Sequence, residues 1–532
     1  MLSPAWYRSW PVWLLASLLL PPLGLVLLWT RPGIRIPRRI LGSLLLIILG
    51  AAYLHKLFGL RMEMDGTGMR PILSFSKPES HYALLEASRE GQRRTFAEPS
   101  AKPASDATAP EASTGIGQPR DSHLPENKTG NTAAAIPRLT FHAPYWTDFR
   151  GPHRDGHYDE LKISTHWASQ GPALLWRQPI GRGYASFVIA AGRAFTIEQR
   201  RHQEVVAAYE VETGRELWTR GWEAEFQESM GGDGPRATPT WHNGRLYALG
   251  AQGELCCLNA ENGRQVWAVN ILKDNQAANL TWGMAASPLI VDDKVIVLPG
   301  GPAGKSVVAY DKFSGIPIWK VLDDQQAYTS PMLVTLAGKR QLLIVSARRV
   351  MGVTIEDGTL LWEYPWVTEH GINSAQPILL SDHRFFISAG YGHGSAVVDI
   401  ISNGEKLSAK TVWENVRMKN KFTSSVLENG YIYGLDEAIL ACIQADTGEL
   451  KWKGGRYGYG QVLLAGGHLI VLSESGELAL VKTTPDSYQE LARFQAIEGK
   501  TWNHPAIAGG RLLVRNANEM ACFDLLDARG SE

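Results

Sequence analysis

Cysteine is scarce in this sequence, with only four residues in a chain of 532. None of them precedes Cys256, and no Cys-x-x-Cys-His motif is present. The sequence therefore shows no signal for covalently attached haem. Cys257, Cys442 and Cys522 recur at equivalent places in a repeat, where a small apolar residue is expected, so we predict that they are buried core residues.

The chain also lacks net charge, because 53 basic side chains are balanced by 53 acidic ones. No overall field favours a nucleic acid as partner. The 14 histidines are scattered without the spacing of metal ligands. Gly-rich stretches at 300–304 and 390–394 lack the strand-to-helix setting of a nucleotide site. We therefore predict no nucleic-acid partner and assign no metal ligand.

Tryptophan, by contrast, is plentiful, and it recurs with a period. An aromatic residue ends each of eight units that are spaced by 39 to 52 residues: Trp176, Trp218, Trp267, Trp319, Trp362, Trp413, Trp452 and Phe494. A period of this length indicates a repeat architecture in which each unit buries its apolar face against the next.

Four units share a sharper motif, of which Ala309, Asp311, Ser314, Gly315 and Trp319 form the cleanest copy. The Ser-Gly pair, or Thr-Gly and Asn-Gly in the other copies, is typical of a tight turn between two strands. The aromatic residue four positions after the Gly would then lie on an outer strand and dock against the neighbouring unit. We predict this structural role for the seven tryptophans of the period.

Short β-rich runs divided by turn signals are typical of propeller blades. We predict an all-β, eight-bladed β-propeller. The segment 502–524 supplies three strands, and 174–179 supplies a fourth, so the two ends of the domain would complete one blade. Closing the ring in this way removes exposed sheet edges. We expect the lead-in segment, Trp146–Trp167, to pack across the first blade.

These motifs resemble the tryptophan-docking repeats of the pyrroloquinoline quinone (PQQ)-like propeller family, over roughly residues 145–524. That family includes quinoprotein alcohol dehydrogenases and BamB-type propeller proteins, so the resemblance implies the fold and leaves the activity open. The dehydrogenases bind PQQ beside a Ca²⁺ ion held by Glu, Asn and Asp, with an Asp as base. Some also have a disulfide between adjacent cysteines, which the pair Cys256–Cys257 resembles.

Two apolar runs near the N-terminus, at about 10–29 and 40–58, are long enough to cross a bilayer. We predict a transmembrane helical hairpin within residues 1–61. Its connector holds four arginines and no acid, which favours a cytoplasmic connector and an extracytoplasmic, periplasmic propeller. The alternative is that one run is a signal sequence ending near 50–52.

Residues 62–143 are rich in Ser, Pro, Ala, Thr, Glu and Lys, so we predict a disordered linker between the anchor and a propeller domain at 144–532. As a flexible coil it would reach about 50 Å. No cysteine is available before this linker for a lipid anchor. The membrane hairpin would take that place.

The ligand surface of a propeller lies where the loops that enter the innermost strands converge on the axis. Aromatic, cationic and amide side chains occupy these loops, and we select them as ligand-binding candidates: Tyr184, Arg236, Trp282, Tyr328, Asn373, Lys421, Phe422, Tyr459, Trp502 and Asn503. Such a funnel suits a flat polar or anionic ligand. The same aromatic residues could instead simply fill the channel. No catalytic residue can be named.

Three functions remain open. The first is a binding or assembly module of the cell envelope, monomeric, anchored in the membrane and serving envelope protein partners, without an assigned cofactor. The second is a PQQ-dependent dehydrogenase that oxidises an alcohol or a sugar with PQQ and Ca²⁺. The third is a ligand-sensing or carbohydrate-binding propeller. Acids near the funnel loops, such as Glu228 and Asp233, lie outside the loops themselves, so the Ca²⁺ and base residues of the enzymes are not visible.

Overall fold

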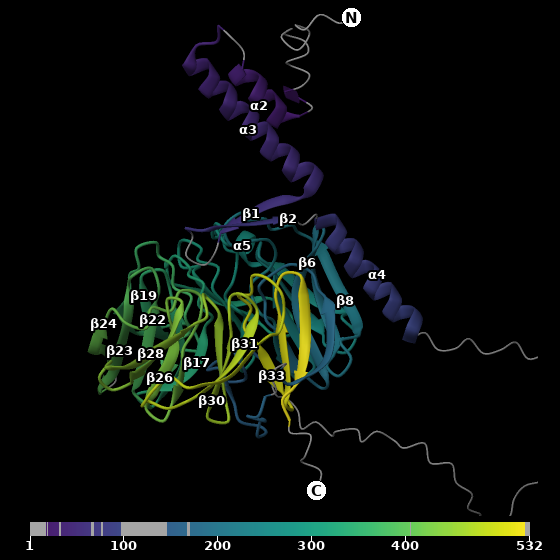
Figure 1. The fold of residues 1–532 in the computed structure, drawn as a ribbon. Coiled ribbons are helices and arrows are strands. Elements are labelled where there is room, and N and C mark those ends of the chain that lie inside the picture. Colours follow the sequence, from purple (N-terminus) through teal and green to yellow (C-terminus); the bar gives the residue numbers. More distant parts are fainter. Residues whose placement is uncertain are drawn as a thin grey trace, which may run out of the picture.

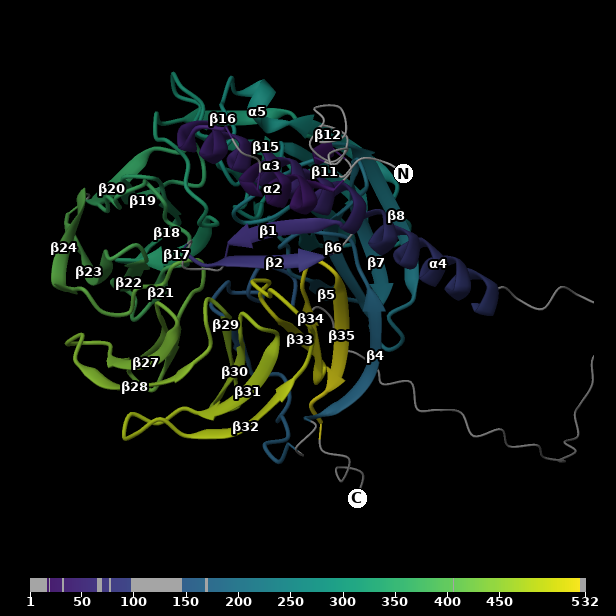
Figure 2. The ribbon, with the colours of Figure 1, turned by 45° about the horizontal axis from the view of Figure 1, so that its top comes forward.

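The computed structural model describes residues 17–18, 20–30, 33–64, 69–75, 78–96, 146–167, 171–404 and 406–526. Its main body is a closed ring of eight sheets that radiate from a central axis (Figures 1 and 2). The four main strands of every blade are antiparallel and are ordered from the axis outward. The prediction of an eight-bladed all-β propeller is confirmed.

Blades 1 to 4 follow the chain without a crossover. Blade 1 consists of β5 (Val188–Ala190), β6 (Arg193–Arg200), β7 (Gln203–Glu210) and β8 (Glu216–Glu223). Blade 2 consists of β9 (Thr240–His242), β10 (Arg245–Leu249), β11 (Glu254–Asn259) and β12 (Gln265–Asn270), and the short helix α5 (Ile271–Asp274) follows it. Blade 3 consists of β13 (Leu289–Val291), β14 (Lys294–Val297), β15 (Val307–Asp311) and β16 (Pro317–Val321), and blade 4 of β17 (Met332–Leu336), β18 (Lys339–Val345), β19 (Arg349–Val353) and β20 (Leu360–Pro365).

Blades 5 to 8 complete the ring. Their strands are, for blade 5, β21 (Ile378–Leu379), β22 (Arg384–Ala389), β23 (Gly394–Asn403) and β24 (Lys406–Asn415); for blade 6, β25 (Val426–Glu428), β26 (Tyr431–Asp436), β27 (Ile439–Gln444) and β28 (Leu450–Arg456); for blade 7, β29 (Gln461–Ala465), β30 (His468–Leu472), β31 (Glu477–Lys482) and β32 (Glu490–Gln495), with β3 (His157–Tyr158) added in parallel beside β29; for blade 8, β33 (Ala506–Ala508), β34 (Arg511–Arg515), β35 (Glu519–Asp524) and β4 (Ala173–Pro179). Because β4 pairs with β35, both ends of the domain close the last blade, as expected.

The periodic tryptophans lie on the outer strands and join neighbouring blades. For six of the seven, the indole N–H donates to a backbone carbonyl of the next blade at 2.7–3.2 Å: Trp176 to Val211, Trp218 to Ala260, Trp267 to Lys312, Trp319 to Ile355, Trp413 to Ala445 and Trp452 to Thr484. Trp362 instead donates to Gln341 within its own blade, at 2.6 Å. Six of the eight blade junctions are thus hydrogen-bonded through the residue that marks the repeat.

The lead-in segment closes the axis instead of covering the first blade alone. Arg150 and Arg154 are almost completely buried. The Arg150 guanidinium donates to the carbonyl of Ser425 in the loop before blade 6, at 2.8 Å. That of Arg154 donates to the carbonyls of Pro288 and Pro331, at 2.5 and 2.8 Å, at the entrances of blades 3 and 4. Buried carbonyl groups at the inner strands therefore receive donors from one segment.

Two antiparallel helices, α2 (Pro21–Thr30) and α3 (Ile36–Phe58), project from the propeller (Figure 1). The indole N–H of Trp29 donates to Ser43 at 2.9 Å and joins them. Among the described residues, only α3 is long and apolar enough to cross a membrane. Its 23 residues extend over about 35 Å. Of the first predicted span, 10–29, residues 17–18 and 21–29 are helical. Residues 1–16 lie outside the described chain.

The segment that we predicted to be a linker from residue 62 contains regular structure. Strands β1 (Leu60–Met64) and β2 (Pro71–Phe75) pair as a hairpin directly after α3, and helix α4 (Pro78–Phe96) follows. Helix α4 lies along the outside of the propeller beside β8 (Figures 1 and 2). Because most residues of α4 are polar and only a few are buried against the blade, the sequence pattern did not predict this helix. Residues 97–143 of the predicted linker lie outside the described chain.

All four cysteines are buried and unpaired by disulfides. Cys256 and Cys257 are consecutive residues of β11, so their side chains point to opposite faces of the sheet. Cys256 packs with the core shared by blades 1 and 2, whereas Cys257 packs with the core shared by blades 2 and 3. Burial raises the pKa of the Cys256 thiol well above its usual value. The adjacent pair is therefore a result of strand alternation.

Candidate functional site

An axial cavity of about 400 Å³ opens at the end of the ring where the predicted loops converge. Seven of the ten candidate residues line it: Tyr184, Arg236, Trp282, Tyr328, Lys421, Phe422 and Trp502. These seven residues come from loops at six different blade junctions, since each loop enters an innermost strand beside the axis. Residues far apart in sequence are thereby brought together.

The aromatic side chains form two groups across the cavity. Phe422 contacts Trp502, with ring centroids 4.7 Å apart, and Trp502 contacts Tyr184 at 5.5 Å. Trp282 and Tyr328 form a second, edge-to-face pair at 5.8 Å. Burial raises the pKa of Tyr328 to about 12, so its phenol stays neutral at physiological pH. The cavity thus offers flat apolar faces with a hydroxyl at their edge.

Positive side chains lie against these rings. The Arg236 guanidinium is 5.5 Å from the ring centre of Tyr184 and donates to the Gly232 carbonyl at 2.6 Å. The Lys421 ammonium lies 4.6 Å from the ring centre of Tyr391. Burial lowers the pKa of Arg236, although its normal pKa is high enough that it remains charged. These cations give the cavity a positive character.

Three candidates do not line the cavity, and their side chains form hydrogen bonds within the propeller instead. The amide N–H₂ groups of Asn373 and Asn503 donate to backbone carbonyls, at 2.9 Å to Ser346 and 3.0 Å to Ala185. The Tyr459 hydroxyl donates to Glu437 at 2.9 Å. All three side chains are buried. Their loop positions were read correctly, but the direction of each side chain is set by packing that the sequence pattern does not reveal.

Several lining residues were not among the candidates. Phe149 of the lead-in segment forms the floor with His504, their ring centres 5.8 Å apart. Burial lowers the pKa of His504 to about 3, so this imidazole is neutral. Tyr391 enters from the turn between β22 and β23, and Met64 from the β1–β2 hairpin. Only Tyr391 had a usable signal, because turns between second and third strands lie at the same end of the ring as the loops that were searched.

Carboxylates are absent from the cavity lining that the structure describes. Acids close to the lining have partners of their own: Glu474 accepts from the Trp502 indole at 2.9 Å, Asp233 pairs with Arg182 at 2.5 Å, and Glu228 accepts from the Met230 N–H at 2.7 Å. In the described part of the chain, no group of three or more His, Cys, Asp or Glu side chains could hold a metal ion. Ca²⁺ prefers several carboxylate and carbonyl oxygens. The donors around this cavity therefore do not fit the Ca²⁺ partner of PQQ.

The chain is similar to known proteins chiefly through its propeller. A family model described as "Outer membrane protein assembly factor BamB" matches residues 202–454. A protein of that name from Shewanella oneidensis is 22% identical over 48% of this chain and 66% of its own length, just under two thirds. Another from Burkholderia pseudomallei is 19% identical over 60% of this chain and 91% of its own.

Solved structures support the same fold. The quinohemoprotein alcohol dehydrogenase from Comamonas testosteroni superimposes with a TM-score of 0.51 at 12% identity, over 73% of this chain and 82% of its own. At this identity the similarity concerns the fold and not the reaction. The chain thus carries a PQQ-like propeller and resembles the BamB-type propeller proteins.

Proposed function

We propose that this protein is a binding and assembly module of the cell envelope. The match of residues 202–454 to the BamB model, together with relatives named as outer membrane protein assembly factors, carries this proposal. Helix α3 would anchor the chain in a membrane, and the four arginines between the two predicted spans favour a cytoplasmic connection between them. The propeller would then work in the periplasm.

The axial cavity is the surface we assign to the partner. Aromatic faces beside Arg236 and Lys421 suit a polar or acidic segment of an envelope protein, because rings supply contact area and cations complement charge. Trp and Arg are the residue types that most often dominate protein interfaces. The partner would contact the loops of several blades at once.

Photo-crosslinking in the native cell tests this assignment. A photoreactive amino acid placed at Trp282, beside the cavity, should crosslink to an outer-membrane assembly component that mass spectrometry identifies. The same amino acid placed at Asn429, an exposed residue in the turn between β25 and β26, serves as the matched control. Equal crosslinking at the two positions, or none at Trp282, would contradict the proposed binding surface.

A PQQ-dependent dehydrogenase is the second candidate, favoured by one observation. The flat aromatic walls and the cations Arg236 and Lys421 suit a planar polyanion such as PQQ. No carboxylate lines the described cavity, so the carboxylate ligands that Ca²⁺ prefers and an acidic base are missing from its described lining. Dye-linked alcohol or sugar oxidation after incubation with PQQ and Ca²⁺ would overturn the proposed assembly function. A carbohydrate ligand would rest on the aromatic faces alone.

A further inference from the structure

The structure assigns a docking slot at the junction of blades 1 and 8 that accepts an arginine-bearing helix. We infer that helix α4 occupies this slot in the intact protein. By doing so it holds the end of the propeller that carries the axial cavity beside helix α3. The slot is formed by the carbonyls of Pro179 and Ile180, by Tyr209, and by Glu216. It lies on the outside of the ring, away from the axial cavity.

Helix α4 presents one stripe of residues to the propeller. Tyr82, Leu85 and Arg89 are 5%, 1% and 3% exposed, although the residues between them are mostly exposed. Their spacing of three and four positions places them on one helix face. His81 on the same side contacts the Ile180 carbonyl through Nε2 at 2.8 Å. A helix with this composition would be marginal in water, so its packing against the blade stabilises it.

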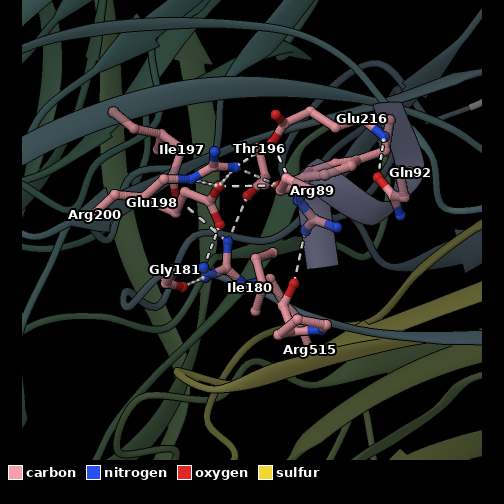
Figure 3. Close-up of polar contacts among 12 residues, drawn as sticks. Arg89, Gln92, Ile180, Gly181, Thr196, Ile197, Glu198, Arg200, Glu216 and Arg515 are labelled. Carbon is pink, nitrogen blue, oxygen red and sulfur yellow. Dashed lines mark hydrogen bonds and ion pairs between the residues drawn. The ribbon is translucent and has the colours of Figure 1, made fainter. Parts of the chain in front are cut away.

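Arg89 is the central contact of this face. Its Nη2 donates to the Pro179 carbonyl at 2.7 Å, and its Nε lies 3.2 Å from Glu216. The guanidinium also stacks over Tyr209, 5.1 Å from the ring centre. Figure 3 shows it pointing from the helix into a group of charged blade residues. A buried arginine is tolerated only where such partners compensate for the lost water.

The blade side of the slot is held by its own buried hydrogen bonds and ion pairs. Glu198 is fully buried, accepts from the Gly181 N–H at 2.6 Å and pairs with Arg200. Arg515 donates to the Gly181 carbonyl at 2.8 Å (Figure 3). Burial alone would raise the pKa of Glu198, but the charges of Arg200, Arg515 and Arg89 hold it below its usual value. The rigid pairs keep Glu216 and the strand ends in position.

A second arginine, on the blade, pairs with acidic residues of helix α4. Arg201 of the turn between β6 and β7 donates to Glu86 at 2.8 and 3.0 Å, and it pairs with Glu79. It also covers the ring of Tyr82 at 5.8 Å. These exposed pairs add little free energy on their own. Together with Arg89 they define one register of the helix on the blade, because each arginine reaches across the interface from the opposite side.

Docking of α4 changes how the propeller is attached. The chain passes from α3 through the β1–β2 hairpin to α4, and Met64 of that hairpin lies at the axial cavity. Figure 1 shows the hairpin at the same end of the ring as α5. The docked helix therefore holds the cavity end next to α3. A free linker would let the propeller turn.

Hydrogen–deuterium exchange of the full chain in detergent tests the docking. In the wild type the α4 amides should be protected, and Arg89→Ala should speed their exchange about tenfold or more, with unchanged exchange in the core strands. Arg89→Lys should give an intermediate effect, because an ammonium cannot reproduce both contacts. Leu84→Ala, at a side chain of the same helix that is 61% exposed, is the control and should leave exchange unchanged. Rapid wild-type exchange in α4, or equal rates in Arg89→Ala, would overturn the proposal.

Spin-label distances test the orientation. The four native cysteines are buried, so Lys56→Cys on α3 and Ser229→Cys on a cavity loop can be labelled selectively. A narrow distance distribution is expected in the docked protein, and a broad one after Arg89→Ala. Protected α4 amides with a broad wild-type distribution would overturn the orientation while leaving the slot intact. A distribution that Arg89→Ala does not alter would show that α4 does not set the attachment.

Discussion

At the scale of single residues, the motif glycine has two tasks in this fold. Gly315 has a φ of +74°, which the tight turn requires. It also lies on the Trp267 ring of the preceding blade, so that a Cβ would come within 2.7 Å of the indole. Gly214 and Gly263 lie in the same way on Trp176 and Trp218. The turn motif predicted the positive φ of this glycine. Its close packing on the tryptophan ring depends on the neighbouring blade and was not predicted.

Substitution of Gly315 by Ala should therefore cost more than backbone strain. We expect a loss of about 2–4 kcal/mol in the free energy of unfolding, from the left-handed conformation and the overpacked ring together. Gly338→Ala is the matched control, since Gly338 has the same φ of +74° with no atom within 4 Å of the added carbon. It should lose only about 1 kcal/mol. Equal losses in urea unfolding would contradict the second task.

Glu204 makes stability depend on pH. It is fully buried, accepts from the Ala251 N–H at 2.8 Å, and burial raises its pKa to about 7 from 4.5. Folding therefore takes up a proton between these pH values, and the free energy of unfolding falls as pH rises through that window. The contribution is about 3 kcal/mol. The difference between the wild type and Glu204→Gln should change by this amount from pH 5 to 8. Parallel pH profiles would contradict it.

At the scale of elements, the lead-in segment contributes more than its sequence suggests. It was expected to pack across the first blade, but its two arginines point into the ring and bind carbonyls from several blades. The pairing of Arg154 with Asp148, at 3.0 Å, helps to compensate for its burial. This segment also supplies Phe149 to the cavity floor. It therefore couples ring stability to the site.

Removal of the Arg154 side chain should loosen the ring. We expect Arg154→Ala to lower the free energy of unfolding by about 3–5 kcal/mol, because it leaves buried carbonyls and Asp148 without their partner. His153→Ala, one position earlier and exposed, should change it by less than about 0.5 kcal/mol. Thermal unfolding of both variants gives the comparison. A loss below 1 kcal/mol for Arg154→Ala would contradict the proposed closure of the axis.

The elements that the sequence did not predict share one physical cause. Helix α4 and the β1–β2 hairpin lie in a polar stretch where only a few side chains bury, so neither apolar period nor composition marks them. The blade that packs against α4 determines the role of its buried residues Tyr82, Leu85 and Arg89. The blades, by contrast, repeat one pattern, and each copy supports the reading of the others. Repetition therefore made the ring predictable.

At the scale of the whole molecule, topology could be read but side-chain direction could not. The loops that enter the innermost strands were located correctly, so most candidates line the cavity. Asn373, Asn503 and Tyr459 turn into the frame because backbone carbonyls and Glu437 there need partners. Contributions from Phe149 and Met64 come from outside the repeat, where no repeat position can indicate them.

The central claim is that the axial cavity is a binding surface and not a Ca²⁺-dependent quinone site. A calorimetric titration of the full chain with PQQ, in the presence and absence of Ca²⁺, tests it most directly. Because no described carboxylate lines the cavity, Ca²⁺ should leave any PQQ affinity unchanged, and no alcohol or sugar oxidation should follow. Tight binding that requires Ca²⁺, accompanied by dye-linked dehydrogenase activity, would contradict the account.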